Sequence, residues 1–155
     1  MDGQKRQSLQ EAAETLGRAR TAVLSVVDPE TGGPYGSLVN VAVTADFCPV
    51  ILVSSLARHT KGLLKDNRTS LLVHADLPKD GDALTSLRLT MTGVFHKSDT
   101  EAARQVYLAR HPYAENYASF GDFSFWSMVP AKLFVVAGFG RIHSFNFSEI
   151  STLQV

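Results

Sequence analysis

Short runs of apolar and β-branched residues, separated by polar turn clusters, constrain the fold of this chain most strongly. The runs span residues 21–27, 35–45, 50–55, 69–75, 87–95, 123–128 and 133–145. In the run LRLTMTGVF, apolar and polar residues alternate, which is typical of a strand with one buried face. Gly138 and Gly140 predict a bulge or sharp coil within the last run. The links are short, so we expect a mainly β (α+β) domain with an antiparallel sheet.

Helical patterns lie between these runs and predict a few short helices. Ser8 followed by Glu11, and Ser98 followed by Glu101, have the spacing of a capping box at a helix start. Apolar residues recur after each box at helical spacing. The expected helices span residues 8–20, 56–66 and 98–110, and a further short helix is expected within 113–120.

The size and charge of the chain narrow the class of protein. The 155 residues are enough for one domain, which we assign to 1–155, and fifteen basic residues balance fifteen acidic ones. A neutral domain is a poor nucleic-acid binder. One cysteine, Cys48, excludes an internal disulfide and a site built on several thiolates, and no histidine pattern predicts a metal site. With no long apolar segment, we expect a cytoplasmic protein that does not bind membranes.

The segment SSLARHTK, residues 54–61, concentrates hydroxyl and basic side chains where a strand is expected to pass into a helix. A helix N-terminus favours an anion, and Arg58 and Lys61 are three residues apart, on one helical face. Arginine offers a forked donor set and lysine a point charge for phosphate. Two interpretations stay open at this stage: a phosphate site, or the solvated first turn of a surface helix.

Arg88 is the second basic residue in an unusual place, inside a strand pattern. By alternation it shares one face with Thr90 and Thr92, while the leucines beside it face the other way. This face is either solvated or contributes a second cation to the same anion site.

Five stretches together resemble the pyridoxamine 5′-phosphate oxidase-like, FMN-binding split-barrel superfamily. Within it, the chain is most similar to the branch that includes the haem-utilisation flavin-fold proteins. The matching stretches are GGPYGSLVNVA (32–42), SSLARHTKGLLKDNRTSLLV (54–73), LRLTMTG (87–93), YLARHPYAENYASFGDFSFW (107–126) and VVAGFGRIHSF (135–145). Two differences from many relatives are Gly62, where asparagine is common, and the lack of tryptophan in the last stretch.

The resemblance implies a six-stranded antiparallel split β-barrel that forms a homodimer, with FMN bound in clefts between the subunits. It implies that the cofactor is held by Ser37, Leu38, Val39, Asn40, Ser54, Ser55, Arg58, His59, Thr60, Lys61 and Arg88. More weakly, it places Arg141 and His143 near the substrate.

The resemblance also implies a function. We expect an FMN-binding flavoprotein, a flavin-dependent oxidoreductase that acts on a small substrate that the sequence does not identify. The flavin would carry the redox chemistry, so no catalytic residue is assigned. Two alternatives stay open: a haem-binding or haem-degrading protein on the same barrel, and a flavin carrier or sensor without catalysis.

Overall fold

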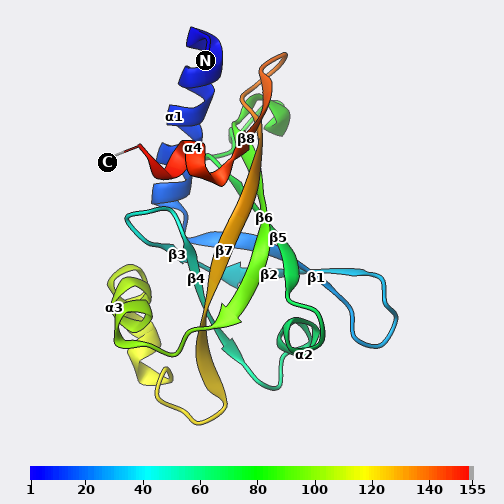
Figure 1. Ribbon diagram of the computed structural model, residues 1–155, viewed down its shortest axis with the longest axis vertical. Helices are drawn as coiled ribbons and strands as arrows, with labels where there is room; N and C mark the ends of the chain where they lie inside the picture. Colours follow the sequence, from blue (N-terminus) through cyan, green and yellow to red (C-terminus); the bar gives the residue numbers. More distant parts are fainter. Residues whose placement is uncertain (154–155) are drawn as a thin grey trace.

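A single antiparallel sheet dominates the computed structural model, which describes residues 1–153 (Figure 1). The strands are β1 (Thr21–Val27), β2 (Pro34–Asn40), β3 (Ala42–Val43), β4 (Pro49–Ser54), β5 (Arg68–His74), β6 (Arg88–Lys97), β7 (Phe123–Val136) and β8 (Ile142–Asn146). Their order is β2-β1-β5-β6-β7-β4-β3, and β8 also pairs with β7. The expected mainly β fold with a few helices is confirmed, with eight strands instead of six.

The long strand β7 splits the sheet. Its first residues pair with β4, from Phe123 opposite Ser54, and its last residues pair with β8, from Lys132 opposite Asn146. Strand β6 pairs with β7 over residues 88–97. Figure 1 shows β7 running along most of the molecule, so that β4 and β8 lie toward opposite ends of it.

The helices flank the sheet, and their starts differ from expectation. They are α1 (Gly3–Arg18), α2 (Arg58–Lys65), α3 (Glu101–Arg110) and α4 (Phe147–Ser151), with 3-10 turns η1 (Ala83–Thr85) and η2 (Pro112–Asn116). Asp2 caps α1 and Thr100 caps α3. The predicted caps were therefore wrong. Ser8 is instead fully buried within α1, because its helical face packs on the sheet.

The buried side chains form two clusters. The larger cluster lies between α1 and the curled sheet and includes Leu16, Leu24, Met91 and Phe95. The smaller lies under α3 and η2, where Tyr107 packs against Phe125 with ring centroids 5.7 Å apart. This second cluster fixes α3 beside the start of β7.

One long strand, β7, takes the place of the strand expected at 123–128 and of the first part of the strand expected at 133–145. The strands predicted at 123–128 and 133–145 were wrong in their boundaries, because β7 continues through Pro130. Pro130 is tolerated because the register shifts there, next to Gly93 on β6, where any Cβ would collide with the Val129 carbonyl oxygen. Gly138 and Gly140 have positive φ and form the turn between β7 and β8, not a bulge within a strand.

Candidate ligand pocket at the start of α2

Helix α2 lies directly on β1, and Gly62 makes this possible. A Cβ on Gly62 would stand 2.9 Å from Val26 Cγ2 and 3.0 Å from the Val27 carbonyl oxygen. A larger residue would push the helix away from the strand. The glycine therefore fixes the first turn of α2 relative to the sheet.

A pocket of about 390 Å³ opens beside this first turn. Five predicted site residues line it: Leu38, Val39, Asn40, Ser54 and His59. The rest of the wall consists of Leu52, Val53, Ala57, Tyr107, Tyr117 and Phe123. The structure thus brings together the ends of β2 and β4 with the start of α2, and the contact of these residues with a cofactor stays a prediction.

The aromatic wall was missed by the site prediction. Tyr107 ends in the pocket from α3, and Tyr117 follows η2. Burial raises the pKa of both phenols, so both stay protonated at neutral pH. The signal was present in the stretch 107–126, which carried the family resemblance but gave no individual contact.

His59 presents a half-buried imidazole to the pocket. Burial lowers its pKa, so the ring is neutral at neutral pH. Among the residues that the structure describes, the ring has no hydrogen-bond partner. A neutral imidazole in this setting can ligate a metal or accept a hydrogen bond.

Beyond His59, the first turn of α2 offers further groups that suit an anion. Thr60 is 2 % exposed, and its buried Oγ1 has no partner within residues 1–153. Ala57 caps the helix without a side-chain hydrogen bond, and the first N–H groups of a helix lack partners within it. Lys61 is exposed and makes no ion pair with any described carboxylate. A hydroxyl, a helix N-terminus and a free ammonium group therefore lie on one turn.

The two serines before α2 hold the strand-to-helix connection. Ser54 Oγ donates to Asp122 Oδ2 over 3.1 Å and accepts from the N–H of Leu56 over 3.1 Å. The N–H of Ser55 donates to the Asp122 carbonyl oxygen over 2.7 Å. Their contact with a cofactor stays a prediction.

Arg58 faces away from this cluster, toward the turn between β1 and β2. Its guanidinium donates twice to the buried Asp28, with both distances 2.8 Å, and once to Glu30 over 3.4 Å. The arginine lies 5.6 Å from the Tyr35 ring centroid. Its hydrogen bonds hold the pKa of the Asp28 carboxyl well below its usual range. The Nε and Nη2 donors of Arg58 are thus already bonded to carboxylates. A phosphate contact by Arg58 stays a prediction.

Arg88 and Ser37 lie outside the pocket. The alternation predicted for β6 is confirmed, with Leu89 and Met91 buried. Arg88 donates to the carbonyl oxygens of Leu84 over 2.7 Å and Ser86 over 3.4 Å. It pairs with the end of β7 far from Ser54, so one chain does not bring it to the cluster. The Oγ of Ser37 is buried without a described partner.

Arg141 and His143 lie at the β7–β8 hairpin, also outside the pocket. Arg141 Nη2 stands 2.8 Å from Glu11 Oε2 on α1, and its Nε donates to the Ala137 carbonyl oxygen over 3.1 Å. Both ring nitrogens of His143 are buried and have no partner in the described part of the chain. Arg141 ties the hairpin to α1, and the role of Arg141 and His143 near a substrate stays a prediction.

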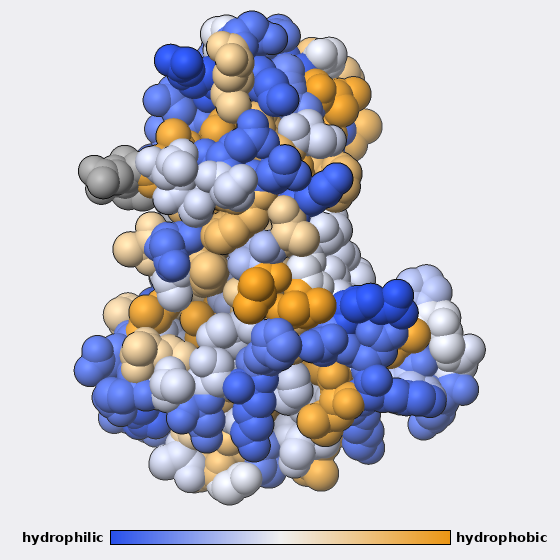
Figure 2. Space-filling view, in the orientation of Figure 1, coloured by the Kyte–Doolittle hydropathy of each residue, from blue (hydrophilic) through white to orange (hydrophobic). Residues whose placement is uncertain are grey.

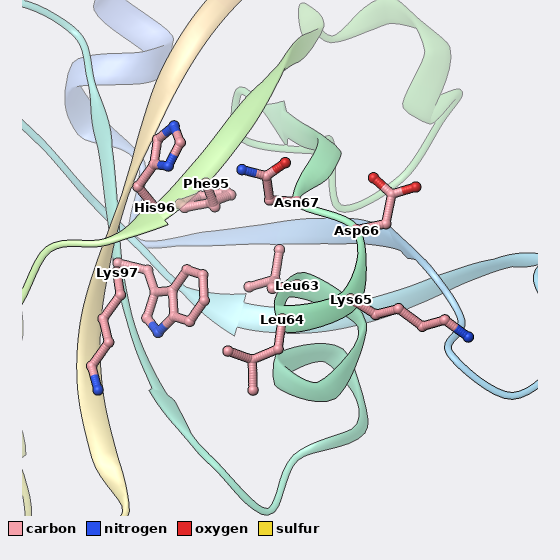
Figure 3. Close-up of a pocket in the computed structure, with 9 residues that line it drawn as sticks. Leu63, Leu64, Lys65, Asp66, Asn67, Phe95, His96 and Lys97 are labelled. Atoms are coloured by element: carbon pink, nitrogen blue, oxygen red, sulfur yellow. The ribbon is translucent and has the colours of Figure 1, made fainter.

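A second hollow, of about 340 Å³, lies at the other end of α2 (Figure 3). Its floor is apolar and includes Leu63, Phe95 and Trp126. Figure 3 shows Lys65 and Asp66 pointing away from it, and both are bonded elsewhere, to the Pro29 carbonyl oxygen and to Arg68. None of the predicted site residues lines this hollow, so it is not the candidate site.

Comparison with known proteins identifies the family. A model described as "CREG, beta-barrel" matches residues 11–150. The chain belongs to the CREG β-barrel family. This agrees with the split-barrel resemblance, as does a putative pyridoxamine 5′-phosphate oxidase from Listeria innocua, with a TM-score of 0.64 and 12 % identity over 84 % of this chain and 98 % of that one.

Two more similar relatives are named for haem. The Arabidopsis thaliana protein "Non-canonical heme oxygenase HOZ, chloroplastic" is 44 % identical over 110 residues, which are 69 % of this chain and 33 % of that protein. A haem-binding protein from Mycobacterium smegmatis superposes with a TM-score of 0.87 and 27 % identity, over 96 % of this chain and 61 % of that one. The chain thus spans one third and three fifths of their lengths.

Two further observations bear on the remaining expectations. No helix in residues 1–153 is long and apolar enough to cross a membrane. Among the same residues, no group of three or more histidine, cysteine, aspartate or glutamate side chains could hold a metal ion. The cytoplasmic location stays a prediction, and the Arabidopsis relative is named as chloroplastic.

Proposed function

We propose that this chain binds haem in the pocket beside α2. The observation that carries the proposal is the neutral imidazole of His59, without a partner among the described residues, in a pocket whose other walls are apolar and aromatic except for Asn40 and Ser54. Haem is held in proteins by such a ligand within an apolar pocket. The two relatives named for haem support the same ligand.

The donor set also fits the acidic edge of haem. Thr60 and Lys61 lie on the same turn as His59 but outside the residues that line the pocket. The N-terminus of α2 and the free Lys61 would hold a propionate carboxylate at the pocket's edge, and the buried, orphaned hydroxyl of Thr60 would join them as a donor. When bound, haem iron would supply the oxygen chemistry expected of a haem oxygenase. The chain's own side chains bind and orient the group, and the phenols of Tyr107 and Tyr117 stay protonated at the pocket wall.

The active unit in this proposal is a homodimer. Residues on neighbouring strands form one row across the outer face of the sheet, because the register places each opposite the next. The row runs through the exposed Leu38, Val23, Leu72 and Phe134, with the half-buried Thr90 between Leu72 and Phe134. Figure 2 shows hydrophobic residues gathered near the middle of one face. A row in which four of five side chains are exposed and apolar is suited to a second copy of the chain.

A two-fold axis near the middle of the row would complete the pocket. In an isologous interface each end of the row contacts the other end on the partner copy. Leu38 both begins the row and lines the pocket, so the β6–β7 end of the second copy would approach it. Arg88 lies on the same face as Thr90 and would reach the predicted anion site in this way. Replacing Leu72 with glutamate should leave a 16.9 kDa monomer in sedimentation, where the wild type sediments as a dimer.

FMN is the second candidate, and one observation favours it. A phosphate needs more donors than a carboxylate, and the first turn of α2 offers a hydroxyl, free N–H groups and an ammonium group together. A flavin there would make the protein an oxidoreductase for a small substrate, or a carrier.

An absorbance titration of the purified chain with haem, and separately with FMN, tests the proposal. We expect a saturable Soret band with haem at one equivalent per chain, and weaker binding of FMN. Saturable FMN binding without a specific haem complex would favour the second candidate. Binding of neither would contradict both.

A further inference from the structure

The strand that carries the pocket residues breaks at Val41, and a buried histidine holds the break. Strand β2 ends at Asn40 and pairs with β1, whereas β3 begins at Ala42 and pairs with β4. Val41 is 1 % exposed, and its carbonyl oxygen lies 2.8 Å from His111 Nε2. A buried carbonyl without a partner would be costly, so this hydrogen bond stabilises the corner.

The same histidine reaches the pocket through a second contact. Tyr113 Oη lies 3.1 Å from His111 Nδ1, and Asn40 Nδ2 lies 3.1 Å from Tyr113 Oη. The Tyr107 ring, part of the pocket wall, packs on His111 with centroids 4.8 Å apart. His111 therefore touches the backbone after Asn40 directly and its side chain through Tyr113.

The direction of each hydrogen bond in this chain follows from the Val41 carbonyl. A carbonyl only accepts, so His111 Nε2 carries the proton. Burial lowers the pKa of His111, so the ring is neutral and Nδ1 is an acceptor. Tyr113 donates its single proton to Nδ1, and its oxygen is then the acceptor for Asn40 Nδ2. The amide of Asn40 is held with Nδ2 toward Tyr113, and the Asn40 side chain also lies beside the phenol of Tyr107 on the pocket wall.

We propose that His111 is a positioning residue, which acts through Tyr113 to fix the Asn40 amide for contact with the bound ligand. The inference rests on the proposed function, because the ligand is the one bound in the pocket beside α2. A histidine that merely stabilised the corner at Val41 would need no link to Asn40. The link through Tyr113 is what gives this buried residue a role in recognition.

A double-mutant cycle on Asn40 and Tyr113 tests the inference. Tyr113→Phe keeps the bond from His111 to Val41 and removes both bonds of the Tyr113 hydroxyl, the one to His111 Nδ1 and the one to Asn40. We expect Tyr113→Phe and Asn40→Ala each to weaken haem binding by about 3- to 10-fold, the effect of one hydrogen bond. The double variant should lose no more than either single variant. Asn67→Ala, at the other hollow, should leave the affinity unchanged.

Two results would overturn the inference: an unchanged haem affinity in Tyr113→Phe, or losses that multiply in the double variant. The cycle is repeated with FMN if the titration favours that ligand.

Nitrogen-15 NMR of the ligand-free protein separates this inference from the proposed function. We expect the neutral Nε2–H tautomer of His111 in the wild type, and a shift of the Asn40 amide signals in Tyr113→Phe. The Nδ1–H tautomer, or unmoved Asn40 signals, would contradict the positioning role whichever ligand binds. Binding of neither haem nor FMN would contradict the proposed function and, with it, the recognition role, even if the tautomer is as expected.

Discussion

The first turn of α2 has two sides that look alike in sequence and differ in the structure. On one side, Arg58 donates hydrogen bonds from Nε and Nη2 to Asp28 and also contacts Glu30, so its guanidinium holds the β1–β2 turn to the helix. On the other, His59, Thr60 and Lys61 have no side-chain partner among the described residues. Basic and hydroxyl residues in a row therefore divide into those that stabilise the fold and those left for a ligand. The division depends on a carboxylate thirty positions away.

Arg141, at the other end of the molecule, is also a predicted site residue that pairs with a carboxylate of a distant element. It was predicted beside a substrate, and its guanidinium pairs with Glu11 of α1. A guanidinium with a bidentate or partly buried carboxylate partner is well placed to hold elements together.

Moving α2 away from β1 should disturb both the Arg58 side and the His59 side of the helix. We expect it to cause the largest loss of stability among these predictions. Gly62→Val would force side-chain atoms into Val26 and the Val27 carbonyl, and should lower the free energy of unfolding by about 3 kcal/mol. Urea denaturation measures it. The control is Gly17→Ala in α1, where a Cβ meets nothing within 4 Å, and which should change stability by less than about 1 kcal/mol. Equal effects of the two variants would show that α2 does not need its close approach to β1.

Alanine substitutions of Arg58 and Lys61 should distinguish a residue that stabilises the fold from one that binds the ligand. Arg58→Ala leaves Asp28 buried without its partner, so the melting temperature should fall, with a smaller effect on ligand affinity. Lys61→Ala should change stability by less than about 0.5 kcal/mol and weaken haem or FMN binding about 10-fold. Thermal melts and absorbance titrations give both quantities. A reversed pattern would place the anion site on the Arg58 side.

Acid should weaken the Arg58 side selectively. Hydrogen bonds from Arg58 and Thr31 lower the pKa of Asp28, so its folded pKa lies below the unfolded value of about 3.9. This contribution is fully present above that unfolded value and is lost as the pH falls below it toward the folded pKa. In Asp28→Asn, the free energy of unfolding should fall less steeply below about pH 4 than in the wild type. If the free energy of unfolding falls equally steeply below about pH 4 in both proteins, the Asp28 carboxyl does not contribute to the loss of stability in acid.

The smallest effect concerns the orphaned hydroxyl. Thr60→Val removes a buried Oγ1 that has no described partner, so the ligand-free protein should be as stable or up to about 1 kcal/mol more stable. The same change should weaken ligand binding, whereas Thr60→Ser should preserve it. Loss of stability in Thr60→Val, seen by denaturant titration without ligand, would mean that the hydroxyl serves the fold.

Local patterns predicted local features of this molecule well. Strand β1 has the predicted bounds, β6 has the predicted faces, and the stretch 54–61 lies at a strand-to-helix junction. These features depend on neighbouring residues, which the sequence shows directly.

Features set by distant residues were not predictable in the same way. The path of β7 through Pro130 depends on Gly93, and the state of Arg58 depends on Asp28. Tyr107 and Tyr117 reach the pocket because α3 packs on the second core. Each requires the fold before the contact can be seen.

The most direct test of the central claim is a haem titration of His59→Ala beside His96→Ala. Both histidines are in or near the pockets at the two ends of α2, and His96 is exposed at the other hollow. We predict that His59→Ala shifts the Soret band and weakens haem binding at least 10-fold, and that His96→Ala changes neither. An unchanged spectrum and affinity in His59→Ala would contradict the assignment of the haem pocket to the start of α2.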